Sequence, residues 1–138
     1  MGSTNILRVL EESVYRHSKH LDRCKQLIRK ASRISTSKLV EGFAALARES
    51  KKLEEVLTAL SSTRIELLFS EDVEMLAAIV FYVYEVSLED ERYLWSKYAK
   101  FNPGENIEEH AIRLNRMKVL AHKILEVIEG NEGKIDKA

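Results

Sequence analysis

Two histidines and the single cysteine of the chain have the types and the spacing of metal ligands. His17, His20 and Cys24 are separated by three and four residues, so all three project from one side of a helix. Imidazole and thiolate groups suit zinc, and a fourth ligand would come from elsewhere, with Glu109 or His110 as the obvious donors. Structural zinc sites usually show paired Cys or His motifs, however. We therefore expect no metal and no cofactor, and keep this trio as the alternative.

An arginine and a histidine near the end of the chain form a second candidate pair. Arg116 and His122 have five residues between them, and the polar Asn115 precedes the arginine. This spacing resembles the Arg-x4–6-His motif of HEPN-type ribonucleases, small helical bundles in which that pair cleaves RNA. The resemblance implies that His122 acts as a general acid–base and that Arg116 stabilises the developing negative charge. Met117 departs from the pattern, because a polar residue often follows the arginine in that family.

Helix geometry limits what this pair can do within one chain. Residues six positions apart on a helix point in directions roughly 240° apart. Arg116 and His122 would therefore cooperate only across a dimer or around bound RNA. Catalysis by this pair is our alternative hypothesis, and the leading prediction is a protein without catalytic residues.

Basic side chains follow the first predicted helix as a stripe. Polar and cationic residues recur every three or four positions, at Arg16, Lys19, Arg23, Gln26, Lys30 and Arg33. We call the five cations among them, all but Gln26, the basic stripe. Such a row suits nucleic acid, because each neutralised phosphate releases counterions. The pattern shows no interleaved exposed aromatic residues on which bases would stack.

Charge is distributed unevenly, although the formal net charge is zero. Residues 1–52 hold 12 Lys and Arg against 5 Asp and Glu, and residues 53–110 hold 4 against 13. The remaining residues, 111–138, hold 6 against 4. The simplest expectation is that the basic and acidic parts lie side by side and compensate each other. The alternative is a solvated or partner-binding basic face.

Two heptad patterns place these candidates on long helices. The first pattern comprises Leu7, Leu10, Val14, His17, Leu21, Cys24, Ile28 and Ala31, and the second comprises Leu39, Phe43, Leu46, Ser50, Leu53, Leu57 and Leu60. Each forms one continuous face of a helix. The cluster Ser35-Thr36-Ser37 interrupts the periodicity and supplies a helix cap. Residues 5–60 should therefore form an antiparallel hairpin that packs through its two apolar faces.

The third helix has two candidate starts and one candidate break. Thr63 and Glu66 have capping-box spacing, and a second N-terminal signature begins at Ser70. Residues 75–84 are apolar all round, which predicts a helix enclosed by neighbours on most sides. A further polar cluster at residues 87–90 leaves open whether this helix is continuous or broken.

The last helix has the clearest boundaries. Asn102-Pro103-Gly104 is the strongest turn signal in the chain, and Asn106 with Glu109 then reads as an N-cap and its reciprocal partner. The apolar positions are Ile107, Ala111, Leu114, Met117, Ala121, Ile124 and Ile128. We expect this helix to end at Gly130, followed by a frayed polar tail over residues 131–138. The predicted fold class is all-α: an antiparallel bundle of four long helices, or five if the third is broken.

Composition narrows the function classes. The 138 residues suit one domain, and 45% hydrophobic with 32% charged residues is typical of a globular protein. A lone cysteine fits a reducing cytoplasm, no signal peptide is visible, and the longest apolar run is about half a membrane span. The leading hypothesis is a non-enzymatic helical-bundle interaction module, such as a small subunit of a larger assembly. It would engage nucleic acid or an acidic protein through its basic N-terminal hairpin. We also expect a protein partner or a homo-oligomer, and no membrane.

Overall fold

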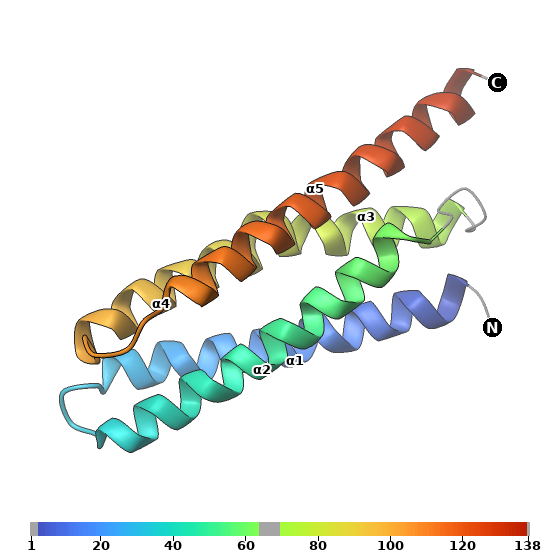
Figure 1. Cartoon of the computed structure of the whole chain (residues 1–138). Helices are drawn as coiled ribbons and strands as arrows, with labels where there is room; N and C mark the ends of the chain where they lie inside the picture. The colour runs from blue at the N-terminus through green and yellow to red at the C-terminus, as the bar shows by residue number, and fades with distance from the viewer. Residues whose placement is uncertain (1–2, 64–69, 138) are drawn as a thin grey trace.

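The protein is a bundle of helices in the computed structural model, which describes residues 3–63 and 70–137 (Figure 1). The elements are α1 (Ser3–Arg29), α2 (Thr36–Ser61), α3 (Ser70–Tyr82), the π-helical segment η2 (Val83–Ser87), α4 (Leu88–Phe101) and α5 (Glu108–Lys137). The described residues contain no strand, so the predicted all-α class is confirmed. None of the helices in these ranges is both long and apolar enough to cross a membrane.

The third rod of the bundle is joined from three pieces without a break. α3, η2 and α4 follow one another directly, and the ribbon of Figure 1 continues through them. In η2 the backbone widens to a π-helix, and the N–H of Leu88 donates to the carbonyl of Val83 five residues earlier. The polar cluster at residues 87–90 therefore marks the end of a π-helix, and the bundle has four long rods.

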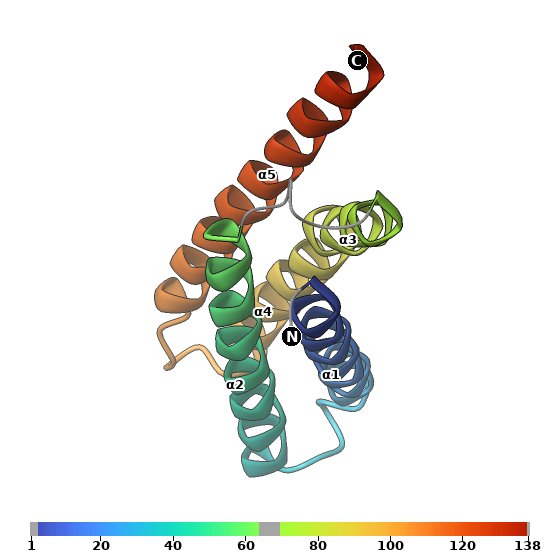
Figure 2. The same ribbon diagram turned by 90° about the vertical axis from the view of Figure 1, so that its right-hand side faces the viewer.

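The four rods pack in a closed ring of neighbours. α1 contacts α2 and the α3–η2–α4 rod, and α5 contacts the same two partners from the other side. Figure 2 shows α1 and α2 below, with the α3–η2–α4 rod and α5 above them. The predicted antiparallel hairpin is the pair α1–α2, which folds back at residues 30–35.

Both heptad faces of the hairpin lie in the core. The second pattern is buried at all seven positions from Leu39 to Leu60. The first is buried from Leu7 to Cys24, and its last two positions, Ile28 and Ala31, are partly buried. On α5 the buried positions are Leu114, Met117, Ala121, Ile124 and Ile128. This apolar interior stabilises the fold because neither helix of the hairpin can cover its own stripe.

One of the expected helix caps forms as predicted, and a second forms in part. The hydroxyl oxygen of Ser35 accepts a hydrogen bond from the backbone N–H of Lys38 at 3.4 Å, at the start of α2. The side-chain oxygen of Asn106 accepts from the N–H of Glu108 at 2.9 Å, at the start of α5. Its expected reciprocal partner, Glu109, instead lies 4.0 Å from Lys51. The proposed partner of Thr63, Glu66, lies outside the described residues.

Two expectations about the second half of the chain are wrong. Residues 75–84 are not enclosed on most sides, because Met75, Phe81 and Tyr82 are about half exposed while Val80 is buried. Within the described residues, one side of this segment packs on α1 and α5 and the opposite side is exposed. α5 also does not end at Gly130 but continues to Lys137, where we expected a frayed tail. A glycine ends a helix when it takes a left-handed conformation, and otherwise costs only about 1 kcal/mol within it.

Truncation of the apolar faces should destabilise the protein. Leu21→Ala and Leu53→Ala each remove a buried side chain and should each lower the free energy of unfolding by about 2–5 kcal/mol. Val119→Ala, at a position 63% exposed, is the matched control and should change it by less than about 0.5 kcal/mol. Denaturant melts measure all three, and control-like values at both leucines would show that the faces do not form a core.

Candidate functional site

The basic stripe lies on the outer surface of the hairpin. Arg16, Lys19 and Arg23 project from α1, Lys30 and Arg33 belong to the turn that follows, and all five side chains are exposed. Arg16 has an ion pair within its own helix, at 3.8 Å from Glu12, with both side chains 57% exposed. Such solvent-exposed pairs contribute little energy and are easily exchanged for another anion.

The acidic middle of the chain does not neutralise the basic stripe. In the described ranges, Glu54 pairs with Arg116 and Glu89 with Lys118, both on α5. Glu91 pairs with Arg113 on α5 and with His17 on α1. Asp90 and Glu109 also reach the basic half, at Lys25 and Lys51, neither of which is a stripe residue. The expected compensation between the two halves is therefore wrong for the stripe, whose positive charge faces solvent.

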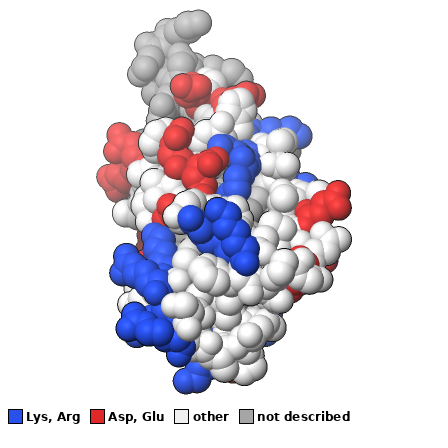
Figure 3. Space-filling model, turned by 90° about the vertical axis from the view of Figure 1, so that its left-hand side faces the viewer, with Lys and Arg blue, Asp and Glu red and all other residues white. Residues whose placement is uncertain are grey.

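Basic residues of α2 widen this surface. His20 sits between α1 and α2, where the charges of both Arg23 and Arg48 act on it. Glu49 lies beside the same histidine, and Lys52 approaches Glu49 at 3.6 Å. We call the surface formed by the basic stripe with Arg48 and Lys52 the hairpin face. Figure 3 looks at the end where α1 turns into α2, with the largest group of Lys and Arg at the lower left and most Asp and Glu above it.

The three candidate metal ligands are turned toward different partners. His17 Nε2 lies 2.7 Å from a Glu91 oxygen, and the Cys24 thiol donates to the carbonyl of Gly42 at 3.4 Å. Burial raises the pKa of the Cys24 thiol to about 12, so without a metal this side chain is a neutral thiol. No cluster of three such ligands lies within ion-binding reach in the described part of the chain. The geometry gives the metal hypothesis no support.

The candidate catalytic pair is likewise not brought together within one chain. Arg116 forms a two-pronged ion pair with Glu54, at 2.9 and 3.1 Å, in a groove of about 610 Å³ between α2 and α5. His122 instead pairs with Glu126 at 3.0 Å and lies against the ring of Tyr84, in a different groove. Cooperation across a dimer or around bound RNA stays a prediction.

A buried polar network, which sequence reasoning missed, is centred on Glu91. One carboxylate oxygen accepts from His17 Nε2 at 2.7 Å, and the other accepts from Trp95 Nε1 at 2.9 Å and Arg113 Nη2 at 3.1 Å. Glu91 and His17 are fully buried, and Arg113 is 1% exposed. A carboxylate can only accept hydrogen bonds, so His17 carries its proton on Nε2.

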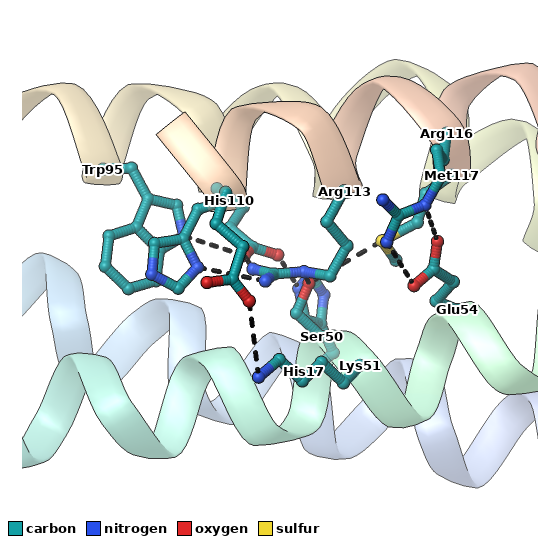
Figure 4. A network of polar contacts seen from close by, with 11 residues as sticks. His17, Ser50, Lys51, Glu54, Trp95, His110, Arg113, Arg116 and Met117 are labelled. Carbon is teal, nitrogen blue, oxygen red and sulfur yellow. Dashed lines mark hydrogen bonds and ion pairs between the residues drawn. The ribbon is translucent and has the colours of Figure 1, made fainter. Parts of the chain in front are cut away.

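Arg113 donates two further hydrogen bonds within this network (Figure 4). Its Nε donates to the Ser50 hydroxyl at 3.0 Å, and its Nη1 donates to His110 Nδ1 at 3.0 Å. Ser50 in turn donates to the sulfur of Met117 at 3.7 Å. The His110 ring stacks on Trp95, with centroids 3.7 Å apart and planes 5° from parallel. The network thus joins α1, α2, α4 and α5.

The pKa values inside the network follow from these contacts. Burial alone would raise the pKa of Glu91, but hydrogen bonds from His17 and Trp95 and the charge of Arg113 outweigh burial and hold it below its ordinary range. Burial, then the charge of Arg113, lowers the pKa of His110. A neutral His110 accepts at Nδ1, in agreement with the bond that Arg113 donates. Glu91, His17 and Arg113 are closed from solvent and fix helix positions, while His110 lies at the partly exposed edge of the network.

Two residues of this network had a readable signal in the sequence. His17 and Ser50 are the polar members of otherwise apolar heptad faces, and a polar residue in such a position needs a buried partner. Glu91 and Arg113 had no such signal, because each stands among other charged or polar residues of an ordinary helix.

Comparison with known proteins identifies no relative of this chain. No protein-family model, no curated protein and no solved structure matches it. The function must therefore be argued from the geometry alone.

Removing one partner of the buried ion pair should destabilise the protein more than replacing both partners with apolar residues. Arg113→Met leaves the Glu91 charge buried without its cation and should lower the free energy of unfolding by about 3–5 kcal/mol. The double variant Glu91→Leu with Arg113→Met removes both charges and should cost less than the sum of the two single substitutions. Urea melts of the three variants measure this. Strictly additive costs would contradict a coupled network.

Stability should also fall in acid in two stages. His20 and His110 have pKa values lowered from 6.5, so the unfolded chain takes up protons first and stability falls as the pH drops below about 6.5. Glu91 has a pKa lowered from 4.5, so its contribution is present above that value and is lost as the pH falls through the folded-state pKa. Melting temperatures between roughly pH 8 and pH 3 measure both stages. His20→Gln with His110→Gln should weaken only the first, and a flat profile would refute the assignment.

Proposed function

We propose that the protein is a non-catalytic helical-bundle interaction module that binds an anionic partner through the hairpin face. The observation that carries the proposal is the exposure of all five stripe cations, none neutralised by the acidic segment within the described ranges. A concentration of one charge sign on one face attracts the opposite sign and accelerates association. Nucleic acid is the partner class that we favour.

The linear form of the stripe supports this choice. Arg16, Lys19 and Arg23 lie within seven residues of one another on α1, about 10 Å of helix, and Lys30 and Arg33 follow in the turn. A row of cations of that length suits a regularly charged polyphosphate chain. Three of the five stripe residues are arginines, whose planar guanidinium can donate two bonds to one phosphate. An acidic protein would need its carboxylates in a matching row.

The interior gives no competing site for chemistry. The titratable groups of the buried network, Glu91 and Arg113 among them, bond to one another, and Arg116 and His122 each have their own carboxylate partner. The ribonuclease hypothesis is therefore not the function that this geometry favours. Exposed Ile112 and Val119 on α5 suit a further protein contact within a larger assembly. The buried thiol of Cys24 is consistent with a reducing, cytoplasmic setting.

Charge reversal on the stripe tests the proposal. Arg23→Glu with Lys30→Glu should weaken binding to labelled oligonucleotides about equally for all sequences, and wild-type affinity should fall steeply between roughly 50 and 200 mM salt. The control is Lys100→Glu with Lys123→Glu, an equal charge change at exposed positions outside the hairpin face. Fluorescence anisotropy measures both.

Two outcomes would overturn the proposal. The first is the absence of salt-sensitive binding to single- or double-stranded DNA or RNA. The second is a metal-independent cleavage of RNA that Arg116→Ala and His122→Ala each abolish while circular dichroism shows an intact fold. The second result would establish the ribonuclease in place of the binding module.

A further inference from the structure

An exposed aromatic side chain lies within the hairpin face. Tyr15 on α1 is 60% exposed, and the ammonium group of Lys19 lies 4.7 Å from the centre of its ring. The prediction that no exposed aromatic residue accompanies the stripe is therefore wrong. Tyr15 falls between the buried positions Val14 and His17, so it points away from the core.

Tyr15 continues the row of cations on the same side of α1. Tyr15, Lys19 and Arg23 are spaced by four residues, so the ring, the ammonium and the guanidinium follow one another over about 12 Å of helix. This order of side chains places the flat ring of Tyr15 at one end of a row of cations that suit phosphate groups. Proteins that bind single strands combine these two elements.

We propose that the partner is single-stranded nucleic acid, with one base stacked on the ring of Tyr15 and the neighbouring phosphates held by Lys19 and Arg23. This inference rests on the proposed function of the hairpin face. A duplex keeps its bases stacked inside, so it has no free base to offer to Tyr15. The Lys19 ammonium sits on a flexible four-carbon stem and can turn from the ring to a phosphate when a base arrives.

The molecule contains its own control for this arrangement. Tyr93 on α4 is 58% exposed, and Lys97 four residues later lies 5.4 Å from its ring centre. The same pair of residue types therefore occurs with nearly equal exposure, but on the acidic segment and outside the hairpin face. Lys97 and Lys100 follow Tyr93 along α4, which then ends. The row beyond Tyr15 instead continues through the basic stripe to Arg33.

The experiment compares Tyr15→Leu with Tyr93→Leu on three probes: a single-stranded oligonucleotide, a duplex of equal length, and a single strand whose bases have been removed. We expect Tyr15→Leu to weaken single-strand binding by about five- to hundredfold, as loss of one stacked base does. Binding to the duplex and to the abasic strand should not change. Tyr93→Leu should behave as wild type on all probes, and Tyr15→Phe, which keeps the ring, should retain the single-strand affinity. Thermal melts verify that each variant is folded.

The outcomes separate this inference from the proposed function. Equal wild-type affinity for single strand and duplex, with Tyr15→Leu unchanged while Arg23→Glu with Lys30→Glu is impaired, would overturn the stacking role and leave the anionic partner in place. A loss on Tyr15→Leu that is equal for the abasic strand would also overturn it, since no base is then involved. The absence of binding to every probe would overturn both.

Discussion

The ion pair between Glu91 and Arg113 is the constraint on which the packing of the bundle depends. Both side chains are removed from water, a loss of hydration that their mutual attraction repays only when the remaining donors and acceptors are also bonded. His17 and Trp95 donate further hydrogen bonds to the Glu91 carboxylate, and Ser50 accepts one from the Arg113 guanidinium. A rotation or a slip of any of these helices would leave a buried charge uncompensated, so the network selects one register of the four rods.

The places where the acidic side chains find their partners explain why the stripe remains exposed. Acidic residues of the second half of the chain pair within the α4–α5 and α2–α5 contacts, as Glu89–Lys118 and Glu54–Arg116 illustrate. Glu91 and Asp90 reach α1 at His17 and Lys25, outside the stripe. The outer surface of α1 has no such neighbour, because its other side is already buried against α2 and the α3–η2–α4 rod. A chain with zero net charge thereby keeps a strongly basic face. The positive charges of the stripe therefore remain on the surface and are not neutralised by contacts within the fold.

What could be predicted from the sequence is what depends on local periodicity. The heptad faces gave the helices, the hairpin and the buried leucines, since those positions face inward whichever helices surround them. The partners of His17 and Ser50 could not be predicted, because Glu91 and Arg113 meet them only through the arrangement of the rods. For the same reason the one-sided burial of residues 75–84 was missed, since an apolar run does not say how many neighbours it will have.

The internal network and the external face are connected through α1. On one side of this helix, His17 is hydrogen-bonded to Glu91, and the Cys24 thiol donates a hydrogen bond to the backbone carbonyl of Gly42 on α2. The Leu27 side chain occupies the space that a Cβ atom at Gly42 would need. These contacts fix the rotation of α1 about its own axis, and therefore the direction in which its outer side chains point. A stripe of cations on a helix held in this way needs little ordering of its backbone when it meets a partner. Most of the cost of binding then falls on the side chains and on the partner, which favours a flexible polyanion that can adapt to a rigid surface.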